Sequence, residues 1–143
     1  MDDIPEGYFP HFRKSPVTQP WEPIYACEAG DRLKLGVRVR PEHCNSRSMP
    51  HGGFLAALAD NAMGLSVGVR MAAAAYPAAR LVTVSLTMDY LGSAGVGQWL
   101  EFDPDFVKLG RSICFTEATV RADGTPVARA RATFKLLEAK AAA

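Results

Sequence analysis

The chain has 143 residues, of which 48% are hydrophobic and 22% charged; this is typical of one compact domain and excludes a fibre or a disordered tail. The formal net charge of +1 offers no electrostatic footprint for nucleic acid, and the three histidines do not stand at metal-ligand spacing. Cys27, Cys44 and Cys114 include no Cys-x-x-Cys pair, so we predict reduced thiols in a cytoplasmic protein. The amino terminus lacks the features of a signal peptide, and Asp60 and Asn61 interrupt the longest apolar stretch, so no membrane segment is expected.

The first half of the chain predicts an arm, a hairpin and a helix. Residues 1–24 are rich in proline and lack a sustained hydrophobic period, so we expect an arm that lies over the domain. Residues 25–39 alternate apolar and charged side chains around a Gly-Asp pair, which predicts two short strands joined by a turn. After a polar loop, residues 52 to about 75 have helical periodicity and precede a Tyr-Pro pair, so they form the one long helix predicted.

Strand-like segments fill the second half, separated by glycine-rich turns or an Asp-Gly pair. They span residues 81–91, 98–109, 111–121 and 125–137. In the first segment, alternation predicts that one face carries Val82, Val84, Leu86, Met88 and Tyr90. We therefore predict an α+β fold in which an antiparallel sheet wraps one long helix, with the domain at 25–137 and a frayed tail at 138–143.

The predicted helix is apolar on every side before Arg70, except for the carboxylate of Asp60. A helix without a polar face is expected to be buried on all sides. An ionised carboxylate in apolar surroundings is strongly destabilising unless it is paired or hydrogen-bonded. Asp60 is therefore either bonded to a nearby polar group or catalytic, and this pattern alone does not separate the two.

A His-Gly-Gly sequence at residues 51–53 stands directly at the predicted start of the helix. Its glycines leave unpaired backbone N–H groups open to an approaching oxygen, and the helix dipole favours negative charge there. These are the requirements of an oxyanion hole. A simple turn with a histidine cap is also compatible with the sequence, and Asn45 in the preceding loop is also compatible with a plain turn residue.

The arrangement of Asn45, the motif at 51–53 and Asp60 resembles the hotdog-fold acyl-CoA thioesterases, specifically the phenylacetate-pathway (PaaI-like) branch. The similarity continues through TVSLTMDYL and VKLGRSICFTEATVRADGTPVARARATFKL, so it covers about residues 45–136. The segment LGSAG after Tyr90 departs from the family, in which a basic residue and a proline often stand there. This difference concerns the edge of the acyl or coenzyme A channel.

The resemblance implies a thioester hydrolase that requires neither a metal nor another cofactor. The Gly52 N–H would hold the thioester oxygen, His51 would fix the loop that carries Asn45, and Asn45 would contact substrate or the attacking water. Asp60 would act as general base or nucleophile, and Thr83 would position the water or the carboxylate. Such chemistry needs little acid assistance, because a thiolate is a good leaving group.

An acyl-CoA substrate is implied by the same resemblance, with cations expected around its phosphates. The predicted substrate-binding residues are Gly53, Tyr90, Lys108, Gly110 and Arg111. Further cations that could serve the phosphates are Arg80, Arg129 and Arg131. The acyl group would be small and aromatic or of medium chain length. Candidates to line its pocket are Phe54, Leu58, Met63, Tyr90 and Trp99, although aromatic residues at such positions are also typical of a plain core.

Helix geometry adds a prediction about assembly. Gly52 and Asp60 lie about 12 Å apart along one helix at about 1.5 Å per residue, too far to contact the same carbonyl carbon. We therefore predict a homodimer, in which antiparallel helices bring Gly52 of one chain to Asp60 of the other, as in the hotdog dimers of the family that the chain resembles. A dimer of dimers is the larger assembly expected, but the sequence does not separate it from a dimer. Two alternatives stay open: an acyl-CoA-binding or regulatory module without turnover, and an acyl-CoA hydratase of the same fold, although the latter usually has a histidine shortly after the aspartate.

Overall fold

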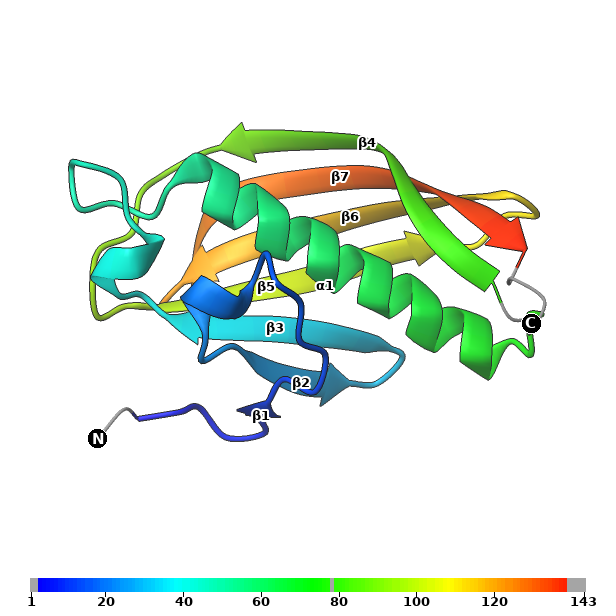
Figure 1. Cartoon of the computed structure of the whole chain (residues 1–143), viewed down its shortest axis with the longest axis horizontal. Coiled ribbons are helices and arrows are strands. Elements are labelled where there is room, and N and C mark those ends of the chain that lie inside the picture. Colours follow the sequence, from blue (N-terminus) through cyan, green and yellow to red (C-terminus); the bar gives the residue numbers. More distant parts are fainter. Residues whose placement is uncertain (1–2, 78, 139–143) are drawn as a thin grey trace.

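The computed structural model describes residues 3–77 and 79–138 (Figure 1). Seven strands form one antiparallel sheet: β1 (Phe9–Pro10), β2 (Tyr25–Ala29), β3 (Arg32–Arg38), β4 (Ala79–Tyr90), β5 (Trp99–Lys108), β6 (Ile113–Ala122) and β7 (Thr125–Glu138). Their order across the sheet is β1-β2-β3-β5-β6-β7-β4, and α1 (Gly52–Ala73) lies across the face around which the sheet curls. The predicted antiparallel sheet around one long helix is thus confirmed. The predicted tail at 138–143 lies outside the described residues beyond Glu138.

The helix α1 has clear signals at both ends. Before it, His51 is extended (φ −63°, ψ 135°), and its Nδ1 accepts a hydrogen bond from the Gly53 N–H, which caps the first turn. After it, Ala75 adopts a φ of 54° and the Tyr76 N–H bonds to the Met71 carbonyl, so the helix ends at Ala73, two residues earlier than predicted.

One face of α1 forms the core with the sheet. The buried side chains of this face are Phe54, Leu55, Leu58, Ala59, Ala62, Met63, Ser66, Val67 and Met71. The opposite face is only partly covered and carries small residues, among them Gly64 and the exposed Gly68. The prediction of burial on all sides is therefore wrong for the single chain, because the sheet reaches around only part of the helix. The sequence predicted that Asp60 and Asn61 leave no apolar stretch long enough to span a membrane. By length and composition alone, the 22 residues of α1 do reach that limit. In this structure α1 packs against β3 and β5.

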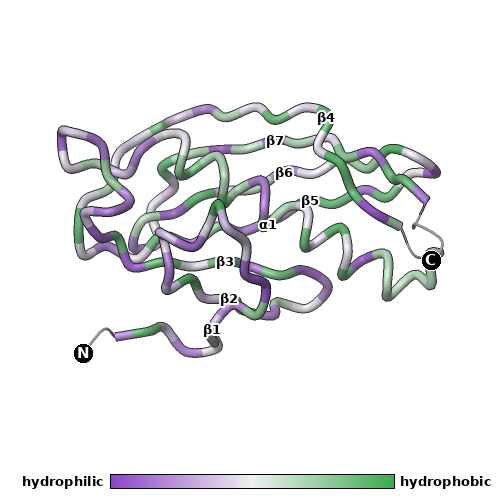
Figure 2. The backbone as a smooth tube through the Cα atoms, viewed as in Figure 1, coloured by the Kyte–Doolittle hydropathy of each residue, from purple (hydrophilic) through white to green (hydrophobic). Residues whose placement is uncertain are grey.

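Strand β4 contains a β-bulge that changes which side chains face the helix. Alternation is visible along the strands (Figure 2), but the pairing of β4 with β7 shifts register between Thr83 and Ser85. Before the bulge, Thr83 pairs with the buried Phe134 and lies on the helix side, while Val82 pairs with the exposed Lys135. After it, Leu86, Met88 and Tyr90 occupy the helix side. The predicted single apolar face is therefore wrong at its first positions, since one inserted residue exchanges the two faces.

The amino-terminal arm is more ordered than its sequence suggests. It adds β1 to the edge of β2, forms a short 3₁₀ helix, η1 (Gln19–Trp21), and buries Ile24 and His11. A second 3₁₀ helix, η2 (Pro41–His43), lies in the polar loop before α1, in contact with η1. The arm thus reaches the end of the molecule where α1 begins (Figure 1).

The protein is expected to lose stability in mild acid because two imidazoles are buried. Burial lowers the pKa of His11 and of His43 below the ordinary value of 6.5. Their contribution to the free energy of unfolding is complete above about pH 6.5 and falls as the pH drops towards the lowered pKa values, because the unfolded chain then binds protons that the folded chain does not. Urea midpoints measured from pH 7.5 to 5 test this loss.

A matched variant isolates the contribution of His11. Neither ring nitrogen of His11 has a hydrogen-bond partner among the described residues, so His11→Phe exchanges an unsatisfied imidazole for an apolar ring. We expect this variant to lose less stability than the wild type between pH 6.5 and 5. An unchanged dependence on pH would contradict the assignment.

Candidate active site

Asp60 and Thr83 meet on the partly open side of α1. The Thr83 hydroxyl donates a hydrogen bond to Oδ1 of Asp60 at 2.8 Å, and the carboxylate is half-buried. The bulge in β4 makes this contact, because it turns Thr83 rather than Val82 towards the helix. One carboxylate oxygen is thereby fixed by a neutral donor, and Asp60 remains accessible to a small molecule or a second chain.

The first turn of α1 forms the other half of the site. The Gly53 N–H is occupied by the His51 side chain at 2.8 Å. As first residue of the helix, Gly52 has an N–H that no carbonyl of the helix can accept. The hydroxyl of Tyr90 donates to the Gly52 carbonyl at 2.6 Å, and burial raises the pKa of Tyr90, so this donor stays protonated. Tyr90 therefore fixes the peptide that follows Gly52, a positioning contact different from the substrate contact predicted for it.

Asn45 organises the loop that precedes the helix. Its Oδ1 accepts hydrogen bonds from the N–H groups of Arg47 at 2.9 Å and Met49 at 3.3 Å. His51 is joined to the same loop through its backbone, since its N–H donates to the His43 carbonyl at 2.9 Å. Among the described contacts, the His51 ring bonds to Gly53 and not to Asn45. The structure thus places Asn45 near the start of α1 but gives its side chain a loop-forming bond pattern.

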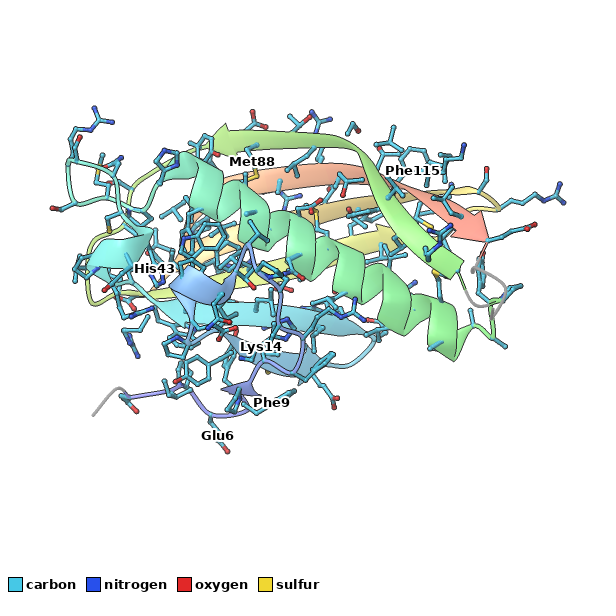
Figure 3. All side chains as sticks on the ribbon, viewed as in Figure 1. Glu6, Phe9, Lys14, His43, Met88 and Phe115 are labelled. Carbon is cyan, nitrogen blue, oxygen red and sulfur yellow. The ribbon has the colours of Figure 1, made fainter. Side chains whose placement is uncertain are left out.

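The predicted phosphate-binding residues lie at the opposite end of the molecule. Lys108 pairs with Phe115 at the turn between β5 and β6, far from His43 in Figure 3, and the Tyr76 hydroxyl beyond the end of α1 bonds to the Gly110 carbonyl at 3.4 Å. A Cβ on Gly110 would lie 2.2 Å from the carbonyl oxygen of Ile113, so the turn itself requires glycine there. A helix of 22 residues is about 33 Å long, so this turn is remote from Gly52 in the same chain.

The predicted arginines differ in whether their charge is already paired. Arg129 contacts the carboxylates of Asp105 at 2.8 Å and Glu117 at 3.0 Å, so its charge is already used within the sheet. Arg80 contacts the Glu138 carbonyl. Arg131 is exposed, as is Arg111. Of these arginines, Arg111 and Arg131 are thus the more available to an anion.

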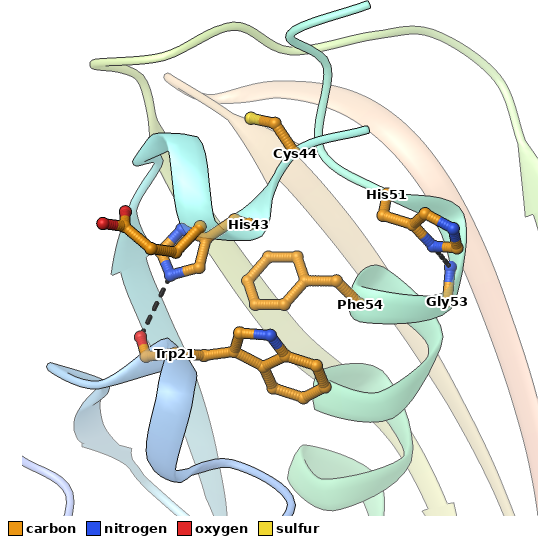
Figure 4. A pocket seen from close by; sticks show the side chains of 7 residues that line it. Trp21, His43, Cys44, His51, Gly53 and Phe54 are labelled. Carbon is orange, nitrogen blue, oxygen red and sulfur yellow. Dashed lines mark hydrogen bonds between the residues drawn. The ribbon is translucent and has the colours of Figure 1, made fainter. Parts of the chain in front are cut away.

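A pocket of about 370 Å³ opens beside the first turn of α1 (Figure 4). His51 and Gly53 line one end of it, and Phe54 forms a wall. The remaining predicted acyl-pocket residues lie elsewhere: Leu58 and Met63 are fully buried against the sheet, and Trp99 packs over Gly36 beside Tyr8 and Tyr25. These three residues are therefore core residues, the alternative that the sequence left open for them.

The pocket also contains a residue that sequence analysis missed. Trp21, at the end of η1, lines it together with His43 and Cys44 from the loop before α1. No periodicity marks Trp21 in the arm, because the contact that matters is with Phe54, which is distant in sequence. All three cysteines are free thiols, and burial raises the pKa of Cys44, so that thiol stays protonated near neutral pH.

Comparison with known proteins gives a consistent family. Residues 39–135 match the acyl-CoA thioesterase N-terminal domain. A candidate esterase of Pseudomonas aeruginosa is 36% identical over 137 residues, which cover 95% of this chain and 99% of that protein. A candidate esterase of Caenorhabditis elegans is 30% identical over 119 residues, which cover 81% of this chain and 68% of that protein.

Solved structures from Thermus thermophilus share the fold. The TT0310 protein is 27% identical and has a TM-score of 0.72. The match covers 87% of this chain and 99% of the TT0310 chain. A variant of the phenylacetic acid degradation protein PaaI has the same TM-score and identity over 86% of this chain and 99% of its own. The sheet that wraps one long helix is the hotdog fold, and the chain belongs to the family of the acyl-CoA thioesterase domain.

Proposed function

We propose that this protein is an acyl-CoA thioesterase of the PaaI-like branch, which hydrolyses a small aromatic or medium-chain acyl-CoA to the free acid and coenzyme A. The observation that carries the proposal is the hydrogen bond between Thr83 and Asp60 on the open side of α1. Asp60 lies eight residues after Gly52 in the same helix. The likeness to PaaI from Thermus thermophilus supports the branch. This pair supplies a positioned carboxylate, and the start of the helix supplies a donor for a developing oxyanion.

The proposed reaction uses groups of the chain alone. The Gly52 N–H donates to the thioester carbonyl oxygen, and Asp60 either removes a proton from a water that attacks the carbonyl carbon or attacks that carbon itself. Negative charge develops on the oxygen at the positive end of α1, where the dipole stabilises it. The C–S bond then breaks and coenzyme A leaves as a thiolate. Where Asp60 is the nucleophile, water hydrolyses the resulting anhydride.

We further propose that two chains share each site. Gly52 and Asp60 are about 12 Å apart in one helix, so one chain cannot apply both to the same carbonyl. Strand β4 lies at the edge of the sheet and carries exposed apolar side chains: Val82, Val84, Leu86 and Tyr90. A long apolar edge strand is a surface that pairs with another strand. Two-fold pairing of β4 with a second copy would set the helices antiparallel, with Gly52 of each facing Asp60 of the other.

A thioester panel tests the proposed activity. Purified protein is incubated with acetyl-, hexanoyl-, decanoyl- and phenylacetyl-CoA and a chromogenic thiol reagent, with free coenzyme A as the expected product. Thermal stabilisation by acyl-CoA without release of thiol would instead indicate a binding module. Consumption of an enoyl-CoA with its thioester intact would indicate a hydratase.

Binding of the phosphates of coenzyme A is expected to depend on Arg111. Because a contact with the distant nucleotide is similar in the ground and transition states, Arg111→Ala should raise KM for acyl-CoA several-fold with little change in kcat. The same variant should hydrolyse an acyl-pantetheine normally. Steady-state kinetics on both substrates measure the difference.

Arg47→Ala is the matched control, because Arg47 is an exposed arginine at the other end of α1, in the loop of Asn45. A raised KM in this variant and not in Arg111→Ala would place the phosphates at the start of the helix. Equal slowing of both substrates by Arg111→Ala would make Arg111 a structural residue.

A further inference from the structure

The pocket beside the first turn of α1 is built by three separate parts of the chain. Trp21 comes from the arm, His43 and Cys44 from the loop before the helix, and Phe54 from the helix itself. Its volume of about 370 Å³ falls within the range of volumes of small-molecule sites. Its lining at His51 and Gly53 brings it next to Gly52, where the thioester carbonyl is proposed to bind.

Aromatic rings form the inner wall of this pocket. The Phe54 ring stacks on the His43 imidazole, with centroids 4.5 Å apart and planes inclined by 8°. Trp21 meets Phe54 edge to face, with centroids 5.1 Å apart at 81°. Figure 4 shows the Trp21 side chain beside the Phe54 ring, on the side opposite Cys44. Since Trp21 is only half-buried, part of its indole remains free to contact a ligand.

The arm is held in this position through its backbone. Nδ1 of His43 accepts from the Arg40 N–H at 3.1 Å, so Nε2 carries the proton and donates to the Trp21 carbonyl at 3.0 Å. The Arg40 guanidinium also donates to the Trp21 carbonyl at 3.2 Å and to the carbonyl of Glu22. None of these bonds uses the indole. The side chain at position 21 can therefore be changed while these anchors of the arm are kept.

We propose that Trp21 sets the size of the acyl group that this protein accepts. The inference rests on the proposed function: from a carbonyl held at the Gly52 N–H, the acyl chain runs past Gly53 into the pocket, and the indole limits how far it extends. Trp21 lies outside residues 39–135, which match the family domain, so the size limit is a property of the arm of this chain.

The test compares Trp21→Ala with the wild type on acetyl-, hexanoyl-, phenylacetyl- and dodecanoyl-CoA. Removal of the indole should raise the ratio of kcat/KM for dodecanoyl-CoA to that for phenylacetyl-CoA by about tenfold or more, since the longer chain gains room and the ring loses an aromatic contact. Acetyl-CoA, which does not reach the indole, should change by less than about threefold. Phe12→Ala is the matched control, because Phe12 is an arm aromatic that is 64% exposed and does not line the pocket.

Each outcome bears on the proposal. An unchanged ratio in a folded Trp21→Ala protein, or the same shift in Phe12→Ala, would overturn it. If Trp21→Ala does not fold, Trp21→Leu keeps an apolar contact with Phe54. This variant should change the ratio of kcat/KM values in the same direction, by a smaller factor. Should the wild type hydrolyse no acyl-CoA, the proposed function fails, and the pocket is then tested by binding of ethyl and dodecyl thioethers of coenzyme A. Trp21→Ala should then tighten binding of the dodecyl thioether alone, and equal binding by both proteins would overturn the size limit.

Discussion

Asp60→Asn is expected to lower kcat for acyl-CoA hydrolysis by about 10²–10⁴-fold, the contribution typical of a positioned general base. The amide has the shape of the carboxylate and can still accept the hydrogen bond that Thr83 donates to Oδ1. It cannot, however, take a proton from water or attack the carbonyl. The fold should persist, and the melting temperature should be unchanged or higher, since replacement of a charged catalytic group often stabilises a protein.

Asp89→Asn provides the control for this loss. Asp89 is a second carboxylate beside the same strand, but it is exposed and lies on β4 opposite Arg129, on the face of the sheet away from the helix. This variant should keep kcat within about twofold of the wild type, because the effect of Asp60 arises only at the site of chemistry. Hydrolysis near the wild-type rate by folded Asp60→Asn protein would remove Asp60 from the mechanism.

Gly52→Pro is expected to lower kcat by about 10²–10³-fold, the cost typical of one lost oxyanion donor. Proline deletes the N–H, and it suits the first position of a helix. The preceding residue, His51, already has the extended backbone that proline requires before it (ψ 135°). The helical bond from the Leu55 N–H to the His51 carbonyl is retained.

Gly52→Ala separates the lost donor from the added side chain. A Cβ at position 52 would lie 3.1 Å from the Tyr90 hydroxyl oxygen, so alanine and proline both press on this ring, but only proline removes the N–H. Alanine should therefore cost much less activity than proline. Equal losses would mean that displacement of Tyr90, and not the missing donor, explains the effect.

The sequence predicted much of the fold because hydrophobic periodicity dominates its second half. Alternation located β5, β6 and β7, and the Tyr-Pro pair limited α1 to within two residues. The bulge in β4 could not be read from alternation, because the pattern Val82, Val84, Leu86 is regular in sequence and only the pairing with β7 reveals the inserted residue.

The site was predicted less completely than the fold. The contact between Asp60 and Thr83 matches what the family resemblance implies, and the capping bond of His51 follows from its place before the helix. Trp21 was missed because an arm without periodicity gives no sign of a partner in the distant helix. The tight turn at Ile113 accounts for the glycine at Gly110, and its predicted contact with substrate stays a prediction.

The most direct test of the shared site mixes two inactive proteins. Asp60→Asn chains keep the Gly52 donor and Gly52→Pro chains keep the Asp60 carboxylate, so a hybrid dimer rebuilds one intact site of two. With random pairing, half of the dimers are hybrids, and the mixture should recover about a quarter of the wild-type activity. Chains with different affinity tags confirm exchange, and gel filtration confirms dimers. If subunits exchange and the mixture shows only the average of its parents, Gly52 and Asp60 do not complete one another across an interface.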